Sequence, residues 1–239
     1  MSFASPAPAF GATITVTTQS DLNAIDGECS IREAIQNAND NAATFSECTA
    51  GAGASDTIVF GGGAASGTIT FTGNISVITT IIIDGGNDVI LSGGGAQQLF
   101  TLGSSASDLT LTNITIEDGF SGGAGGAILA NGTTSALTIV NSLVQDNVAD
   151  GTGGAILTNG SLTITNSVFQ NNSAGGDGGA IDHSSSEPLT VTSSAFVGNT
   201  AGTNAGNTDG SGGAIYHQGA VSGPSAITAS YFFNNQVDN

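Results

Sequence analysis

Three titratable side chains near residue 185 are those whose types could perform catalysis. Asp182, His183 and Glu187 lie close together in the chain. A glycosidase needs two carboxyl groups that face each other about 5–9.5 Å apart across the scissile bond. Isolated acids in a polar segment are more often solvated surface groups. We therefore expect no catalysis at this cluster, and a carbohydrate-active enzyme is the alternative.

Four aspartates come shortly before paired glycines, where turns could bring carboxylates and backbone carbonyls together at one corner. They are Asp118, Asp150, Asp177 and Asp209. Oxygen donors of this kind are the ligands of Ca²⁺. The nonapeptide glycine–aspartate repeat of calcium-binding β-helices is missing in register, and solvated turn acids explain the same pattern. We expect no cofactor, with calcium as the alternative.

The segment Asn207-Thr-Asp209 resembles the first motif of polygalacturonases, but the other motifs of that family do not accompany it. There is no adjacent Asp-Asp pair, no Gly-His-Gly and no Arg-Ile-Lys. A uronate lyase needs a basic residue to abstract a proton and to hold the substrate carboxylate. The chain has a single cation, Arg32. The sequence therefore predicts a protein that is not an enzyme.

A set of threonines recurs at alternate positions of short apolar segments and predicts two outward files on one flat face. Such a face resembles the Thr-x-Thr faces of β-solenoid antifreeze proteins, which implies ice binding. Threonine also simply favours exposed strand positions, and Val140 interrupts one file. The residues of the face are Thr110, Thr112, Thr138, Thr163, Thr165, Thr190, Thr192 and Thr228.

These side chains must be positioned by repeats. The phrase Gly-Gly-Ala-Ile occurs four times, beginning at residues 125, 153, 178 and 212. Matching alternating segments begin at residues 109, 137, 162, 189 and 227, which are 25 to 38 residues apart. A period of this size in a glycine-rich, β-branched chain indicates a solenoid. We predict a right-handed parallel β-helix, because parallel crossovers are right-handed.

Aligned repeats predict which columns face the core. One inward column is Leu109, Leu137, Leu162, Leu189 and Ile227, and its neighbour contains Leu111, Ile139, Ile164, Val191 and Ala229. A third contains Ile116, Val144, Phe169, Phe196 and Phe233. Stacked asparagines at strand ends can hydrogen-bond to each other and to turn backbone. We expect such ladders at Asn113, Asn141 and Asn166, and at Asn147, Asn172 and Asn199.

One amphipathic helix is predicted, directly after Cys29. Ser30 and Glu33 have the spacing of a capping box, and an apolar stripe follows at i, i+3, i+4 and i+7. The stripe, which is Ile31, Ala34, Ile35 and Ala38, would cover the open end of the solenoid. Cys29 and Cys48 flank the helix and would form a disulfide, which indicates an oxidising, exported compartment.

Two resemblances follow from these segments. Cys29-Ser-Ile-Arg-Glu-Ala-Ile, a second cysteine and Asp56-Thr-Ile-Val-Phe60 resemble the CSLREA motif at the start of exported bacterial β-helix proteins. Gly-Gly-Ala-Ile with Phe169-Gln-Asn-Asn172 and Phe196-Val-Gly-Asn199 is similar to the repeats of polymorphic outer-membrane proteins, which are adhesins. The resemblance implies a secreted or cell-surface structural protein without catalysis.

Charge and hydropathy restrict the partners. The formal net charge is −18, so a nucleic-acid partner is not expected. No apolar run is long enough to span a membrane. We expect a cell-surface glycan or protein as partner, or copies of the chain itself, assembled end to end. Recognition is assigned to the insertion in the longest repeat, at Asn204, Asn207 and Asp209, with a functionless insertion as the alternative.

The expected organisation is a single repeat domain behind a cap. Residues 1–12 are small and proline-rich, as in a remnant of a signal peptide. Residues 13–55 form the first strand and the disulfide-closed helical cap, and residues 56–239 form the repeats. Because the last repeat stops before its Gly-Gly-Ala-Ile, we expect the parent protein to continue beyond it.

Overall fold

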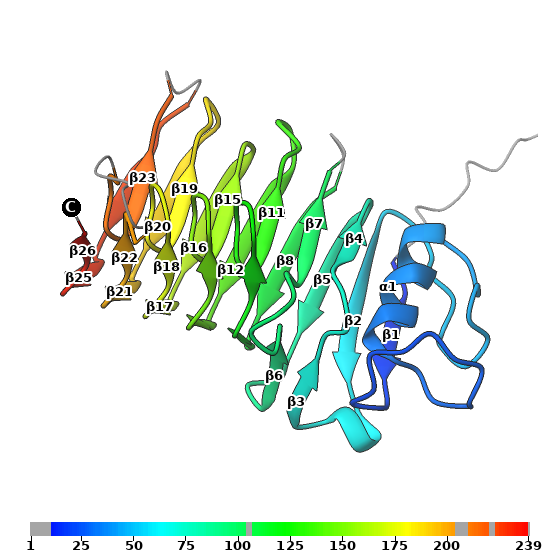
Figure 1. Ribbon diagram of the computed structural model, residues 1–239. Coiled ribbons are helices and arrows are strands. Elements are labelled where there is room, and N and C mark those ends of the chain that lie inside the picture. Colours follow the sequence, from blue (N-terminus) through cyan, green and yellow to red (C-terminus); the bar gives the residue numbers. More distant parts are fainter. Residues whose placement is uncertain (1–10, 104–106, 204–209, 220–222, 239) are drawn as a thin grey trace, which may run out of the picture.

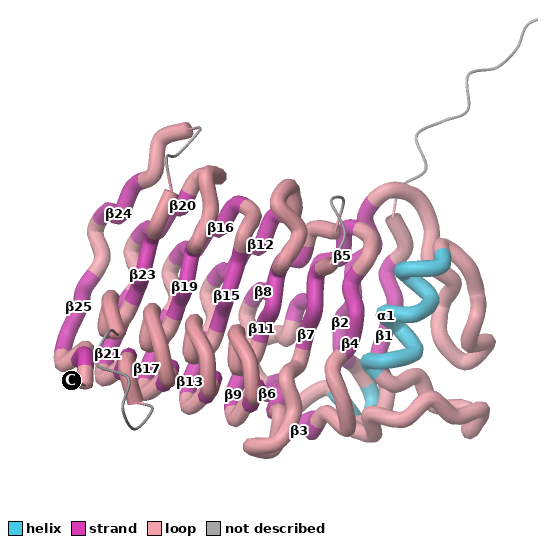
Figure 2. The backbone as a smooth tube through the Cα atoms, turned by 45° about the horizontal axis from the view of Figure 1, so that its top comes forward, coloured by secondary structure: helices cyan, strands magenta, loops and turns pink. Residues whose placement is uncertain are grey.

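The computed structural model describes residues 11–103, 107–203, 210–219 and 223–238. Its strands coil around one axis and stack from α1 at one end to β23–β26 at the other (Figures 1 and 2). In the central repeats each coil contributes one strand to each of four sheets, which we name A to D. The strands pair in parallel throughout. The predicted all-β parallel β-helix is therefore confirmed.

The strands are divided among the four sheets. Sheet A contains β1 (Thr13–Val16), β2 (Ser55–Phe60), β5 (Thr80–Asp84), β8 (Leu109–Thr112), β12 (Ala136–Val140), β16 (Ser161–Thr165), β20 (Leu189–Thr192) and β24 (Ala226–Thr228). Sheet B contains β3 (Gly67–Thr70), β6 (Val89–Ser92), β9 (Thr115–Glu117), β13 (Leu143–Gln145), β17 (Val168–Gln170), β21 (Ala195–Val197) and β25 (Tyr231–Phe233). Sheet C contains β4 (Ile75–Val77), β7 (Phe100–Leu102), β11 (Ile128–Ala130), β15 (Ile156–Thr158), β19 (Ile181–His183) and β23 (Ile215–His217). Sheet D contains β10 (Phe120–Ser121), β14 (Val148–Ala149), β18 (Ser173–Ala174), β22 (Thr200–Ala201) and β26 (Gln236–Val237).

Alternation along each strand places apolar side chains inside the coil. In sheet A the buried positions pair in register from coil to coil, so that Leu137 lies between Leu109 and Leu162. In sheet B, Phe169 stacks on Phe196 with ring centroids 5.0 Å apart. Burying each such side chain stabilises the fold by about 1.5–3 kcal/mol. The inward columns predicted for these coils are confirmed.

The last coil differs from the predicted alignment. Ile227 pairs with Val191 rather than with Leu189, and Phe232, not Phe233, stacks on Phe196 at 4.9 Å. A shift of two residues keeps the same face inward, whereas a shift of one reverses it. Alternation alone therefore could not fix the register of β24. In β25 two adjacent phenylalanines made the choice of the inward one ambiguous.

A buried asparagine ladder follows the bend between sheets B and D, as predicted. The Nδ2 of Asn147 donates to Oδ1 of Asn172 at 3.0 Å, and Asn172 donates in the same way to Asn199 at 2.9 Å. Asn199 donates to Asn235 at 2.8 Å. Each acceptor oxygen also takes the backbone N–H of the preceding asparagine. The ladder therefore satisfies the backbone of a bend that is buried.

A parallel serine ladder at the bend between sheets A and B was not predicted. The Oγ of Ser142 accepts the N–H of Ile114, and the Oγ of Ser167 accepts the N–H of Ser142. The pattern continues to Ser194 and Ser230. These serines are mostly buried and follow the exposed strand-end residue in each coil. The recurring Asn-Ser dipeptide was the signal in the sequence.

The predicted helix is α1 (Ile31–Asp40), and its capping box between Ser30 and Glu33 is formed. A short 3₁₀ turn, η1 (Gly62–Ala64), lies near sheet B. Helix α1 contacts β1, β2 and β4, and Ile31, Ala34, Ile35 and Ala38 are fully buried in the hydrophobic core. Cys29 and Cys48 form a disulfide with their Cα atoms 5.0 Å apart.

The single cation of the chain joins the helix to the first coils. Arg32 pairs with the buried Asp21 at 2.6 Å and also donates to the backbone oxygens of Gly73 and Asn74. Asp21 in turn accepts the N–H of Thr72 at 2.7 Å. These bonds tie the segment before α1 to the turn between β3 and β4.

We predict that Ile35→Asp destabilises the fold by several kcal/mol, because a carboxylate would replace a fully buried aliphatic side chain. The measurement is the free energy of unfolding in urea. Gln36→Asp, on the partly exposed side of the same helix, is the matched control; it loses the hydrogen bond to Asp40 and places two carboxylates at i and i+4, which should cost only about 0.5 kcal/mol. Equal stability of the two variants would mean that α1 does not cover the core.

We also predict that Asn172→Ala weakens the stack, since it removes the acceptor of the Asn147 N–H and of the Asn147 side chain. A buried polar group left without a partner costs about 1–3 kcal/mol. Thermal unfolding measures the loss. Asn171→Gly is the control, because Asn171 is exposed and has a φ of 54° that glycine adopts freely. If the two variants melt together, the ladder is not stabilising.

Candidate functional site

The threonine face lies on sheet A, and its registers were mostly predicted. Thr110, Thr138, Thr163 and Thr190 pair in one file. The second file holds Thr112, Val140, Thr165 and Thr192, and it continues with Thr228. The sequence alignment placed Thr228 in the first file, which is wrong, because Ala226 pairs with Thr190. Ile82 and Asp84 occupy the two files on β5, so the threonines cover only part of the sheet.

The acidic and histidine cluster is divided by the strand that carries it. Asp182 pairs with Leu157 and Tyr216 in an outward column of sheet C, whereas His183 pairs with the buried Thr158 in the inward column. Neighbouring side chains of a strand point to opposite faces. Glu187 follows in a loop, and its N–H donates to Ser185. Asp182 and His183 therefore do not face a common site.

The structure instead brings together two histidines. His183 Nδ1 lies 2.9 Å from His217 Nδ1, and His183 Nε2 lies 3.0 Å from the carbonyl oxygen of Gly160. The carbonyl accepts only an N–H, so His183 Nε2 carries the proton and His217 Nδ1–H donates to the bare His183 Nδ1. Sequence reasoning missed this pair, although both residues follow a Gly-Gly-Ala-Ile repeat at the same distance.

Burial, and next the neighbouring His217, lower the pKa of His183, while hydrogen bonds to backbone oxygens and the nearby Asp182 act in the opposite direction. The neutral imidazole fits its hydrogen bonds. Protonation of Nδ1 would remove the acceptor of the His217 N–H, and the contact would then require His217 to move its proton to Nε2.

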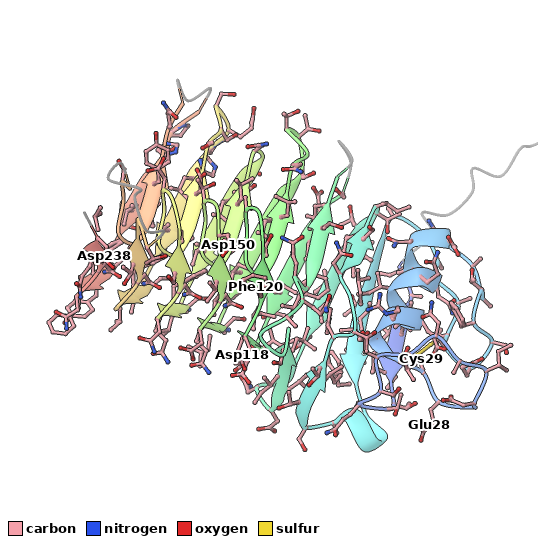
Figure 3. All side chains as sticks on the ribbon, in the orientation of Figure 1. Glu28, Cys29, Asp118, Phe120, Asp150 and Asp238 are labelled. Atoms are coloured by element: carbon pink, nitrogen blue, oxygen red, sulfur yellow. A yellow bond between two sulfur atoms is a disulfide. The ribbon has the colours of Figure 1, made fainter. Side chains whose placement is uncertain are left out.

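The aspartates of the calcium alternative do not share one corner of the coil. Asp118 lies at the bend before β10 and corresponds to Asp146, since Phe120 pairs with Val148. Asp150 follows β14, and Asp177 precedes the turn into β19, so the three acids occupy different points of the coil. In Figure 3, Asp118 is labelled nearer the lower edge of the coils than Asp150. Over the described ranges no three metal-ligating side chains gather. Shared spacing from glycine pairs had suggested a common corner, but the glycines belong to different turns. Asp209, with Asn204 and Asn207 of the predicted recognition loop, lies outside the described residues.

The repeat motifs serve the coil. Gly178 has a φ of 68°, and a Cβ on Gly179 would collide with the carbonyl oxygen of Gly213. Ile181 is fully buried, as are Phe169 and Asn172. The Gly-Gly-Ala-Ile and Phe-x-x-Asn phrases therefore encode close coil stacking and leave the outer faces free to vary. Among the helices that the structure describes, none is long and apolar enough to cross a membrane.

Because the pKa of His183 is lowered on folding, the unfolded chain binds more protons than the native one once the pH falls below about 6.5. Stability should therefore decrease as the pH falls from 7 toward 5. We predict that His183→Gln flattens this decline, as measured by melting temperature against pH. Parallel declines for wild type and variant would contradict the assignment.

Comparison with known proteins finds a similarity in one segment of the chain. Residues 166–184 match the model of the Chlamydia polymorphic membrane protein repeat. The match includes β17–β19, with Phe169, Asn172 and the glycine pair described above. No curated protein and no solved structure matches the chain. The similarity to the polymorphic membrane protein repeat therefore rests on one coil.

Proposed function

We propose that the chain is a non-catalytic, adhesin-type structural protein that is exported or displayed at the cell surface. The observation that carries the proposal is the polymorphic membrane protein repeat at residues 166–184, set in a continuous parallel β-helix. Within this segment Phe169, Asn172 and Ile181 are fully buried and pack the coil. Recognition is then left to the outer faces of a rod.

The disulfide supports the location. Cys29 and Cys48 are buried and bonded, and disulfides persist in oxidising compartments. The segment that carries them also resembles the CSLREA region of exported β-helix proteins. We propose that α1 is the helical cap that belongs to such a region. Because the net charge of the chain is −18, it repels anionic partners, and we expect it to bind neutral groups of a partner.

A second copy of the chain is the other proposed partner. Ile227, Phe232 and Phe233 of the last coil are 43–50% exposed, and with Leu189 they border a hollow of about 590 Å³. The strands β23 to β26 each stand at an edge of their sheets. Exposed edges with apolar side chains pair readily with other chains. Sedimentation velocity at rising concentration tests this association.

Ice binding is a second candidate function, favoured by the register of the threonine files on sheet A. Val140 and Ala226 interrupt those files. Thermal hysteresis of the purified protein decides the question, because an ice binder shows it and an adhesin does not.

For the adhesin proposal, we expect beads coated with the chain to bind cultured epithelial cells saturably, with competition by soluble protein. Beads coated with serum albumin are the control. Binding equal to that of albumin, or without competition, would contradict the proposed function.

A further inference from the structure

A groove follows the bend between sheets A and B across several coils. The groove has a volume of about 350 Å³, which is within the range of small-ligand sites. Asparagine amides line one side, and side chains from β9, β13 and β17 line the other. The lining includes Asn87, Asn113, Asn141, Asn166, Leu143 and Val168.

The backbone fixes the amides along this groove. Asn87, Asn113, Asn141 and Asn166 have φ between 49° and 78°, the left-handed region in which asparagine is favoured among non-glycine residues. Their coils stack in register, because the N–H of Asn113 donates to Val140 and that of Asn141 donates to Thr165. The amides of Asn113, Asn141 and Asn166 are therefore presented at the spacing of the coils, about 4.8 Å.

The hydrogen-bond network leaves part of this row free. Asn113 donates to Asp84 at 2.9 Å and accepts from Asn141 at 3.3 Å, which leaves the Oδ1 of Asn141 as an acceptor. The exposed side chain of Asn166 has no hydrogen bond to the residues that the structure describes. The groove therefore offers both amide donors and acceptors to a ligand.

The chemistry of the two sides selects the ligand. The backbone amides of the bend are engaged between coils, so an extended peptide finds no strand edge there. The Oγ atoms of Ser142 and Ser167 are also engaged. What remains is a row of neutral amides beside the half-buried Leu143 and Val168. Amides pair with hydroxyl groups, and aliphatic side chains pack on the C–H face of a sugar ring.

Charge excludes acidic ligands from the groove. The only cation of the chain, Arg32, is bound to Asp21 at the opposite region near α1, while Asp84 lies beside Asn113. An anionic glycan would meet a carboxylate without a compensating base. We propose that this groove binds a neutral glycan chain that lies along the solenoid axis. This inference rests on the proposed adhesin function and names its ligand class and its site.

The test is titration of ¹⁵N-labelled full chain with cellohexaose, chitohexaose and mannohexaose as neutral probes and with hexagalacturonate as the acidic one. We expect at least one neutral probe to shift the side-chain amide signals of Asn141 and Asn166, with hexagalacturonate inactive. The double variant Asn141→Gly/Asn166→Gly keeps the left-handed bends and should bind that probe at least about tenfold more weakly.

Asn171→Gly is the matched control, because Asn171 is an exposed asparagine with a φ of 54° at the next bend, outside the groove. The inference is overturned if no neutral probe shifts these signals, or if the control loses as much affinity as the double variant. The bead assay separates the two proposals. If beads coated with the double variant still adhere to cells, the proposed groove site is overturned and the adhesin function stands. If the wild-type chain binds the glycan probe but its beads do not adhere, the adhesin function is overturned and the groove site stands.

Discussion

The structure depends on the register between successive coils. Parallel strands hold that register over the straight segments, but at each bend the backbone turns and its N–H groups need other partners. The ladder that begins at Asn147 and the one that begins at Ser142 supply them, from one coil to the next. A chain that lost these side chains would retain its apolar columns but leave buried backbone groups unpaired.

This constraint separates packing from recognition. Inward positions and the buried asparagines and serines of the bends stack the coils, and the segment at residues 166–184 that matches the repeat supplies such positions at Phe169, Asn172 and Ile181. Outward positions are free, and they form the threonine face and the amide groove. The shape of the rod and the chemistry of its surface therefore have different sequence requirements. A match to the repeat indicates the fold, and the ligand must be sought on the outer faces.

Much of the fold could be predicted because its signals are periodic. Leu109, Leu137 and Leu162 repeat at nearly constant spacing, and Ser30 with Glu33 has the spacing of a capping box. Prediction failed where two alignments satisfy the same period, as at Ile227. The calcium alternative linked Asp118 and Asp150, which both come before glycines but lie at different turns. Aligned repeats also predicted the row Asn113, Asn141 and Asn166, in which Asn141 donates to Asn113 across 28 residues. The histidine pair, 34 residues apart, could have been found from the shared distance of His183 and His217 after Gly-Gly-Ala-Ile, but the alignment followed apolar positions and not polar ones.

Amide hydrogen exchange tests the coil register most directly. If stacking of the coils stabilises the chain as described, the amides of β12 and β16 exchange only through global unfolding, while those of the exposed turn residues Asn131 and Thr133 exchange rapidly. Exchange of the β12 and β16 amides as fast as those turn residues would contradict the account. It would mean that pairing with the coils on both sides does not protect these amides.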